Sequence, residues 1–208
     1  MQADASDDGS GNAETLHDAK GRIAFERFET KSSDIYVANA DGTGLRYVPV
    51  VESNNDFEAY LGAPTWSPDG KKIAFTSKGD IYKMDADGSD AIRLTNTEAF
   101  EGAPAWSPDG KKIAFVRQRG EGGPSTVCKS CIYKIRVDGT GLKRLTGTKS
   151  FATDPAWSPN GKKIVFSSAN PDAPNLDVFV MNSDGTEVER LLTKNDASDW
   201  EPNWQPLP

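Results

Sequence analysis

Residues 63–75 read Ala-Pro-Thr-Trp-Ser-Pro-Asp-Gly-Lys-Lys-Ile-Ala-Phe, and residues 103–115 repeat this stretch with one change, Ala for Thr. Residues 154–166 carry a third copy, and a degenerate fourth copy surrounds Trp204. The tryptophans recur roughly every 40 to 50 residues, a period typical of one four-stranded blade of a β-propeller. The repeat therefore predicts an all-β propeller.

Each repeat can be divided into strands from its local chemistry. Ser67–Gly70 has the Pro, Asp and Gly of a tight turn. The stretch 72–75 is apolar on both faces, as expected for a strand covered on both sides by neighbouring blades. A third strand begins at Asp80, and the Asp87-Gly88 pair predicts the hairpin to a short outer strand that ends at Thr95. No stretch has a sustained helical period.

These motifs resemble the PD40 (TolB-like) propeller repeat. The similar features are Pro-x-Trp-Ser-Pro-Asp-Gly-Lys-x-Ile-Ala-Phe, then Asp-Ile-Tyr, Asp-Gly-Ser/Thr and Arg-Leu-Thr, and they cover about residues 21–205. The resemblance implies a non-catalytic β-propeller of the periplasm or cell surface that binds a protein partner in the cell envelope. Propellers of some lyases and of prolyl-oligopeptidase-type enzymes look similar. They leave open an alternative: a metal-dependent lyase or hydrolase-associated propeller that uses carboxylates in its channel.

The two ends of the repeat region look like halves of one blade. Residues 21–25 match a second strand with no Trp-bearing strand before it, and residues 201–205 match a first strand with no partner after it. Pairing of these segments would close a ring of four blades and remove its exposed sheet edges. A truncated larger propeller and a two-chain, eight-bladed ring are the alternatives, so we expect a monomer or a two-chain ring.

The propeller domain is expected to span residues 21–208. Residues 1–20 are rich in Asp, Ser, Gly and Ala and predict a disordered tail. Such a tail resembles the tether that remains after an export signal or lipid anchor is removed, so lipid anchoring through the N-terminus is one hypothesis.

Charge and composition disfavour several function classes. The chain has 24 Lys and Arg against 31 Asp and Glu, a net charge of −7, which argues against nucleic-acid binding through the phosphate backbone. No apolar run approaches the length of a membrane span. The one histidine, His17, lies in the tail, so a histidine-dependent catalytic triad is not expected in the domain. We therefore expect no enzyme activity and no cofactor.

Cys128 and Cys131 form the one reactive motif. A zinc ion would need four ligands, and no second cysteine pair or domain histidine supplies the others, so no metal is predicted. The pair leads into a strand at the position where other repeats carry Asp. The favoured interpretation is a local disulfide at the base of a long loop, and reactive or metal-binding roles are the alternatives.

Loop lengths distinguish the two faces of the predicted propeller. The Ser-Pro-Asp-Gly and Asp-Gly turns are short and uniform, and they share one face. The hairpins and inter-blade links of the opposite face vary in length, so we expect recognition there. We call this the variable-loop face; its segments are 27–33, 50–62, 117–130, 168–176 and 194–200.

Acidic residues recur just before the tryptophans in the links to the inner strands. Glu101 and Asp199 come five residues before a tryptophan, and Asp154 and Glu201 come three before. We expect them at the mouth of the channel, where they would bind a basic segment of a partner or a cation such as calcium. Trp200 is predicted to be an exposed aromatic anchor. The alternatives are an acidic surface without a role and a tryptophan that fills a short core.

Overall fold

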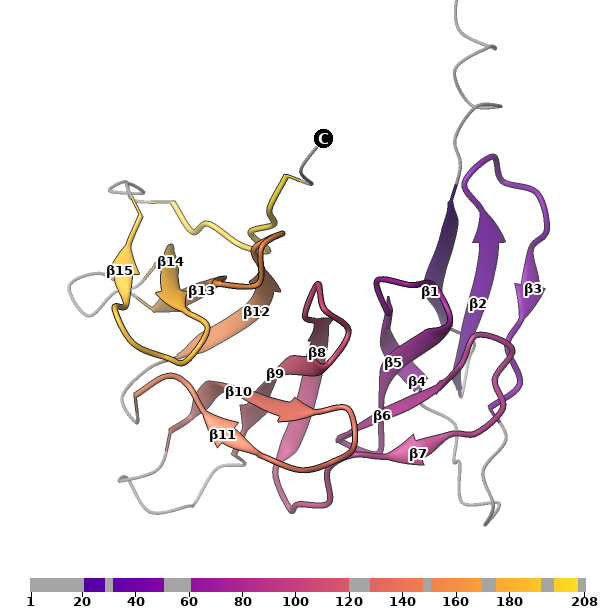
Figure 1. Ribbon diagram of the computed structural model, residues 1–208, viewed down its shortest axis with the longest axis horizontal. Helices are drawn as coiled ribbons and strands as arrows, with labels where there is room; N and C mark the ends of the chain where they lie inside the picture. Colours follow the sequence, from indigo (N-terminus) through magenta and orange to yellow (C-terminus); the bar gives the residue numbers. More distant parts are fainter. Residues whose placement is uncertain are drawn as a thin grey trace, which may run out of the picture.

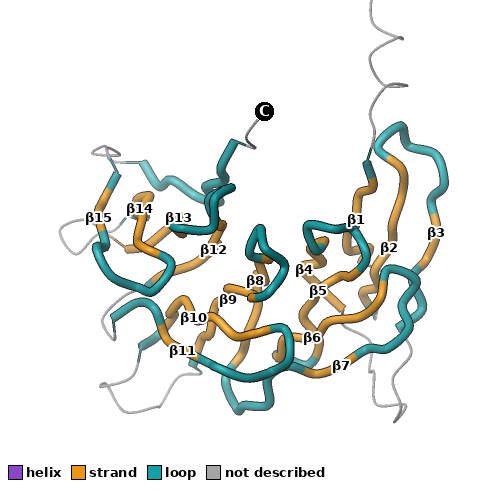
Figure 2. Tube along the Cα trace, viewed as in Figure 1, coloured by secondary structure: helices purple, strands orange, loops and turns teal. Residues whose placement is uncertain are grey.

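The chain forms a series of antiparallel β-sheets. The computed structural model describes residues 21–28, 32–50, 61–119, 128–147, 151–169, 175–191 and 197–205. Every regular element in these ranges is a strand (Figure 2). Four sheets follow one another along the sequence and stand side by side in a U-shaped arc (Figure 1). The prediction of an all-β, blade-by-blade fold is confirmed.

Each sheet is one blade. Among the described residues the first blade has three strands, β1 (Arg22–Phe28), β2 (Ser33–Asn39) and β3 (Arg46–Tyr47). The second blade consists of β4 (Leu61–Trp66), β5 (Lys72–Ser77), β6 (Asp80–Asp85) and β7 (Ile92–Arg93). The third consists of β8 (Phe100–Trp106), β9 (Lys112–Gln118), β10 (Ser130–Arg136) and β11 (Lys143–Arg144). The fourth consists of β12 (Ala152–Trp157), β13 (Lys163–Ala169), β14 (Leu176–Asn182) and β15 (Glu189–Arg190).

The tight turn after each Trp-bearing strand is held by its own residues. Ser107 Oγ donates to Asp109 Oδ1 at 2.5 Å and accepts from the Lys112 amide at 2.9 Å. Gly110 has φ 67°, a conformation in which a side chain is strained, and its amide donates to the Ser107 carbonyl at 2.9 Å. In the fourth blade Asn160 makes the equivalent contacts. The turn therefore needs no tertiary partner, which explains why its sequence recurs almost unchanged.

The hydrophobic core lies between blades. One cluster joins the first and second blades and includes Ile35 and Phe75. A second includes Phe115 and joins the second and third blades, and a third includes Phe166 and joins the third and fourth. Strands β5, β9 and β13 are buried on both faces, as their apolar sequences predict.

A repeated hydrogen bond ties each inner strand to the one before it. The Trp106 indole Nε1 donates to the Thr65 carbonyl at 3.2 Å, and Trp157 Nε1 donates to the Ala105 carbonyl at 3.1 Å. Trp204 Nε1 donates in the same way to the Ala156 carbonyl, at 3.2 Å. Trp204 is therefore docked on the fourth blade as the tryptophan of a further repeat.

The predicted clasp between residues 201–205 and 22–26 is not formed in this structure. In the described part of the chain β1 pairs with β2 alone, and residues 201–205 carry no strand. They lie beside the fourth blade, while β1 stands at the other end of the arc (Figure 1). The packing between blades sets the curvature of the arc, and at this curvature its two ends do not meet. Residues 1–20 lie outside the described residues.

Replacement of Trp106 by Phe should remove the bond between neighbouring inner strands while keeping an aromatic ring. We expect the free energy of unfolding to fall by about 1–2 kcal/mol, measured by urea titration, because the Thr65 carbonyl loses its donor. Trp200→Phe is the control and should leave the midpoint unchanged, since this side chain is 60% exposed. Equal losses in the two variants would contradict a role for the indole bond.

Candidate protein-binding surface

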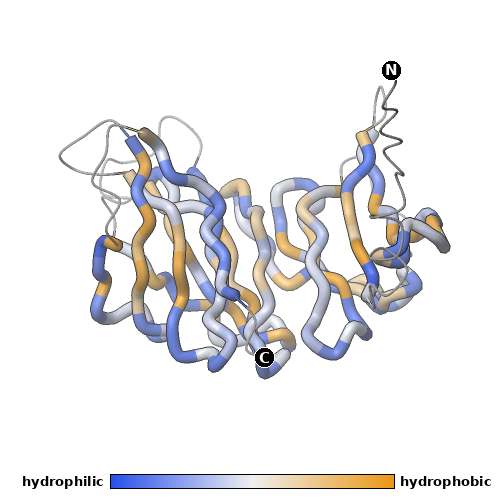
Figure 3. The backbone as a smooth tube through the Cα atoms, turned by 90° about the horizontal axis from the view of Figure 1, so that it is seen from above, coloured by the Kyte–Doolittle hydropathy of each residue, from blue (hydrophilic) through white to orange (hydrophobic). Residues whose placement is uncertain are grey.

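The two ends of the strands present different surfaces. Seen from above, hydrophobic residues follow the strands and hydrophilic residues mark the turns at their ends (Figure 3). The uniform turns lie at one end of the strands. The opposite ends adjoin the variable loops, and the side chains at those ends are the candidates for recognition.

Aromatic side chains are exposed at the variable-loop ends of the strands. Phe28 ends β1 and is 73% exposed, and Phe100 begins β8 and is 56% exposed. Phe151, just before β12, is 42% exposed, and Trp200 is 60% exposed. Trp200 is exposed as expected, but sequence reasoning missed the phenylalanines. A signal was present, because Phe100 and Phe151 each come six residues before a repeat tryptophan.

A pocket of about 390 Å³ opens beside Phe100, between β1 and the starts of β4 and β8. Glu26 points into it, and its Oε2 accepts from the Ala63 amide at 3.3 Å. A Cβ on Gly62 would lie 2.9 Å from Glu26 Oε2, so glycine leaves the room that this carboxylate occupies. Glu26 is an acidic group at this face that the sequence did not single out.

Glu101 does not lie at the channel mouth, contrary to expectation. Its side chain is fully buried, and Arg117 Nε donates to its Oε1 at 2.6 Å. The Thr97 hydroxyl contacts the same oxygen at 3.2 Å. The cross-strand register of β8 and β9 places the two charges opposite each other, which compensates the burial of the carboxylate. Glu101 is therefore part of an internal ion pair, and its replacement would disturb the third blade.

Of the other predicted acidic residues, Asp154 lies on β12, and Asp199 and Glu201 lie in the segment 197–205. The Asp199 amide donates to the Leu176 carbonyl at 2.9 Å, and Asp199 is half-buried there. Asp154 and Glu201 occupy equivalent places in successive repeats and share a positive φ of 52°. Of the five predicted site residues, Asp154, Trp200 and Glu201 present an acidic and aromatic surface.

The surroundings of Asp154 change the pKa of its carboxyl. Burial raises the pKa of its carboxyl, and the negative charge of Glu201 raises this pKa further, against a lowering by the Thr153 hydroxyl. Burial is the larger of the two causes that raise this pKa, and the charge of Glu201 is the smaller one. Within the described ranges no three His, Cys, Asp or Glu side chains lie together as potential ligands of a metal ion.

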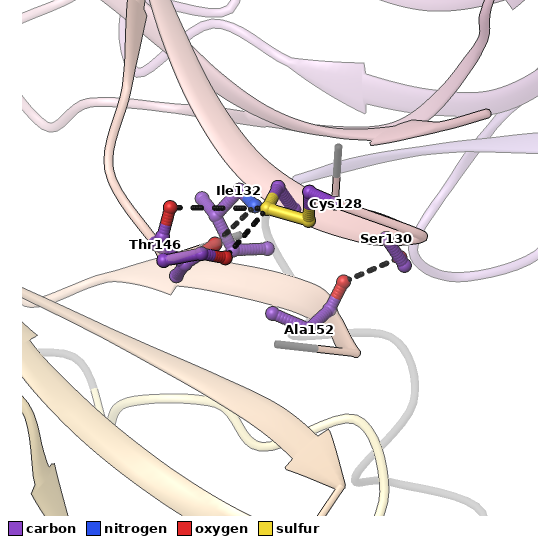
Figure 4. Close-up of a disulfide and its surroundings, with 7 residues drawn as sticks. Cys128, Ser130, Ile132, Thr146 and Ala152 are labelled. Carbon is purple, nitrogen blue, oxygen red and sulfur yellow. Dashed lines mark hydrogen bonds between the residues drawn. A yellow bond between two sulfur atoms is a disulfide. The ribbon is translucent and has the colours of Figure 1, made fainter. Parts of the chain in front are cut away.

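Cys128 and Cys131 are joined by a disulfide at the base of the loop that precedes β10 (Figure 4). The next blade holds this base as well, because Ser130 Oγ donates to the Ala152 carbonyl at 2.7 Å. Cys131 stands where Asp80 and Asp177 stand in the second and fourth blades, and there each Asp pairs with an arginine of the outer strand. The disulfide thus replaces a structural ion pair in the third blade.

Beside the disulfide is a second pocket, of about 410 Å³. Arg117, Arg119, Glu98 and Tyr133 line it together with Cys128. The Arg117 guanidinium lies 4.3 Å from the centre of the Tyr133 ring, so the ion pair with Glu101 and this stacking hold it in place. The lining of this pocket therefore combines three charged side chains with an aromatic ring.

The family model of the TolB beta propeller domain (PD40) matches residues 15–170. The chain belongs to this TolB propeller family. It is 37% identical over 153 residues to the uncharacterized protein Atu1656 of Agrobacterium fabrum, covering 68% of this chain and 50% of that protein. It is 34% identical over 71 residues to the Tol-Pal system protein TolB of Syntrophus aciditrophicus, covering 34% of this chain and 15% of that protein. The chain thus spans half or less of these relatives.

Solved structures agree with the family. A putative TolB from Agrobacterium tumefaciens matches with a TM-score of 0.66 and 29% identity, over 86% of this chain and 66% of that one. TolB from Acinetobacter baumannii matches with a TM-score of 0.64 and 30% identity, over 85% of this chain and 42% of that one. Oligogalacturonate lyase in complex with manganese matches at 0.59 with 14% identity, over 81% of this chain and 48% of that one, a likeness of fold alone.

One further property of this TolB-family chain concerns membranes. The described residues contain no helix that is long and apolar enough to span a bilayer.

Thiol labelling checks the disulfide of this propeller. We expect no labelled cysteine in the native protein and two after reduction, because both sulfurs are bonded and buried. The double variant Cys128→Ser/Cys131→Ser should show none in either condition. Two thiols that label without reductant would contradict the disulfide.

The raised pKa of Asp154 predicts a pH-dependent stability. A carboxyl whose pKa is higher in the folded state destabilises the fold when ionised, and this effect disappears as pH falls through the folded pKa. Asp154→Asn should therefore raise the unfolding midpoint at pH 7, with a difference that shrinks on acidification toward the ordinary Asp range.

Asp109→Asn is the matched control for that measurement. The Ser107 hydroxyl lowers the pKa of Asp109, so its ionised form stabilises the fold at pH 7 and this contribution is lost as pH falls below the ordinary Asp value. The two variants should differ from the parent chain in opposite directions. A stability difference for Asp154→Asn that does not change with pH would contradict the raised pKa of Asp154.

Proposed function

We propose that this chain is a non-catalytic, exported propeller of the periplasm or cell surface that binds a protein partner through its variable-loop face. The observation that carries the proposal is the exposure of four aromatic side chains at that face: Phe28, Phe100, Phe151 and Trp200. Aromatic residues supply a large part of the binding energy at protein interfaces, because they bury much surface and lose little side-chain entropy. Their bases lie on or beside rigid strands, so they are held in place before a partner arrives.

Charge adds a preference for the partner. Glu201 follows Trp200 in the sequence, and its negative charge contributes to the raised pKa of Asp154, on a chain of net charge −7. A basic segment of a protein would relieve their mutual repulsion and contact the tryptophan at the same time. We therefore propose a partner with a basic contact region, and calcium would compete for the same carboxylates.

The family supports the proposed location of the protein. Curated relatives bear the name of TolB proteins of the Tol-Pal system. This supports a partner in the cell envelope and an exported protein, and we include in the proposal a lipid anchor attached through residues 1–20. We do not favour the alternative of a metal-dependent lyase or hydrolase-associated propeller, since the enzyme propellers resemble this chain in fold alone.

Capture of partners from envelope extract tests the proposal. The triple variant Phe100→Ser/Phe151→Ser/Trp200→Ser should reduce the amount of captured partner at least about tenfold, since loss of central aromatic contacts costs on the order of 2 kcal/mol or more. The matched control is Leu45→Ser/Leu142→Ser/Val188→Ser, which removes three side chains of similar exposure near the uniform turns. The control should capture the same proteins as the parent chain.

The acidic pair can be tested with the same assay. Asp154→Asn/Glu201→Gln should weaken capture more at low salt than at high salt, because screening removes the contribution of exposed charges. Equal capture by the aromatic variant and by its control would overturn the proposed binding face.

A further inference from the structure

The pocket of about 390 Å³ beside Phe100 is built from three successive blades. We call it the Phe100 pocket, and its lining includes Glu26, Gly62, Thr76, Lys78, Phe100 and Gly102. These residues lie on β1 of the first blade, on β4, β5 and the turn after β5 in the second, and on β8 of the third. Its volume falls in the range of pockets that bind small ligands, roughly 300–1,000 Å³. A lining drawn from three blades can hold a guest in one orientation.

Glu26 gives the pocket a carboxylate with spare hydrogen-bonding capacity. The side chain is half-buried, and its Oε2 accepts from the Ala63 amide at 3.3 Å, a long hydrogen bond. Among the described residues the other oxygen, Oε1, accepts no hydrogen bond, and no lysine or arginine forms an ion pair with Glu26. A carboxylate can accept about four hydrogen bonds, so most of this capacity remains for a donor in the pocket.

Thr76 adds a second acceptor, which is buried. This residue is 8% exposed, and its Oγ1 has no hydrogen-bond partner among the described residues. A Cβ on Gly102 would lie 3.7 Å from this oxygen, so the glycine keeps the space beside it open. Burial of a hydroxyl without a partner costs free energy, and such groups are rare in native proteins. Because Thr76 lines the pocket, a guest with a donor group would supply the missing hydrogen bond.

The ring of Phe100 is an aromatic wall whose position is fixed. A Cβ on Gly79 would lie 3.5 Å from Cδ2 of the ring, and one on Gly102 would lie 3.3 Å from Cε1. The ring therefore rests against the backbone of two glycines, yet Phe100 is 56% exposed. An aromatic ring that is both held and exposed offers a guest a contact surface with little loss of side-chain entropy.

The third blade shows which group such a combination accepts. There Arg117 Nε donates to Glu101 Oε1 at 2.6 Å, and the guanidinium lies 4.3 Å from the centre of the Tyr133 ring. The Phe100 pocket offers the same two partners, a carboxylate and an aromatic ring, and its lining contains no arginine. A planar guanidinium with five N–H donors can bond to two acceptors and stack on a ring at the same time.

We propose that the Phe100 pocket binds the side chain of an arginine from the basic segment of the partner. The guanidinium donates to Glu26 Oε1 and Thr76 Oγ1 and lies against the Phe100 ring. This inference rests on the proposed function, because it assigns one side chain of the partner to a place on the variable-loop face. Lys78 also lines the pocket and makes a contact of its own, and its like charge limits the affinity for arginine.

Titration with N-acetyl-argininamide tests the pocket without a partner. The full chain is isotope-labelled, and the backbone amides of Gly79, Phe100 and Gly102 are followed by NMR. We expect their signals to shift and to saturate at millimolar ligand. The citrulline analogue, which has the same shape without the charge, should bind at least about tenfold more weakly, because hydrogen bonds to charged groups are the stronger ones. Unshifted signals, or equal binding of the citrulline analogue, would overturn the proposal.

A matched pair of variants tests the carboxylate. Glu26→Gln keeps the acceptor for the Ala63 amide but removes the charge, so N-acetyl-argininamide should bind at least about tenfold more weakly. Glu98→Gln is the control. It removes the same charge two residues before Phe100 but outside the lining, and it should bind as the parent chain does. Equal affinities in these two variants would contradict the assignment of Glu26.

Two further variants separate binding from structure. Thr76→Val removes a buried hydroxyl that lacks a partner, so it should weaken binding without lowering the free energy of unfolding. Lys78→Ala removes a positive charge from the lining and should strengthen binding of the guanidinium. Weaker binding in Lys78→Ala, or unchanged binding in both Glu26→Gln and Thr76→Val, would overturn the proposal.

Capture from envelope extract distinguishes this inference from the proposed function. If the triple aromatic variant loses capture and Glu26→Gln does not, the binding face stands and the arginine subsite is wrong. If Glu26→Gln weakens binding of N-acetyl-argininamide while capture does not depend on the aromatic residues, the pocket binds guanidinium and the proposed protein-binding face is wrong.

Discussion

The fold depends on the burial of each blade between two others. A single four-stranded sheet of this kind is apolar on both faces, so it cannot be stable in water alone. The second strands β5, β9 and β13 are buried on both sides, and the hydrophobic clusters bridge successive blades. The indole bonds of Trp106 and Trp157 fix the distance and orientation of neighbouring inner strands within this packing.

This constraint makes the ends of the arc the least satisfied parts of the molecule. Among the described residues β1 pairs along one edge only, and the buried Trp66 Nε1 lacks the acceptor that the other repeat tryptophans find. The opposite end carries the docked Trp204 and the half-buried Asp199 at the repeat positions of a fourth inner strand.

The same architecture separates stability from recognition. The Ser-Pro-Asp-Gly turns satisfy their own polar groups and leave little room for variation. At the other ends of the strands, the contacts of the polar groups differ from blade to blade. They include a Glu101–Arg117 ion pair, a disulfide in place of an Asp–Arg pair, and Glu26 in the space left by Gly62. The exposed aromatic residues lie at these same ends of the strands, so substitutions there change the binding surface without disturbing the core.

The sequence by itself determined the strands, the tight turns, the blade period and the face that varies. These features depend on local chemistry: alternation and burial within a strand, and a Ser, Asp and Gly that bond within one turn. Trp204 could be assigned from the sequence to the first strand of a repeat, and its hydrogen bond to the Ala156 carbonyl agrees with that assignment. The exposure of Trp200 was likewise predictable from its isolated position in the repeat.

Only the tertiary structure decided which acidic residues reach the surface and whether the ends meet. Glu101 and Asp199 occupy the same place in the repeat, yet Glu101 is buried because cross-strand register sets Arg117 opposite to it. Phe100 and Phe151 are exposed because none of the elements that the structure describes covers the strand starts there. The clasp could be inferred from complementary sequences, but its closure depends on the curvature produced by three packed interfaces. The curvature depends on the volumes of the side chains packed between blades and on contacts between residues far apart in the chain. A repeat motif does not specify these contacts.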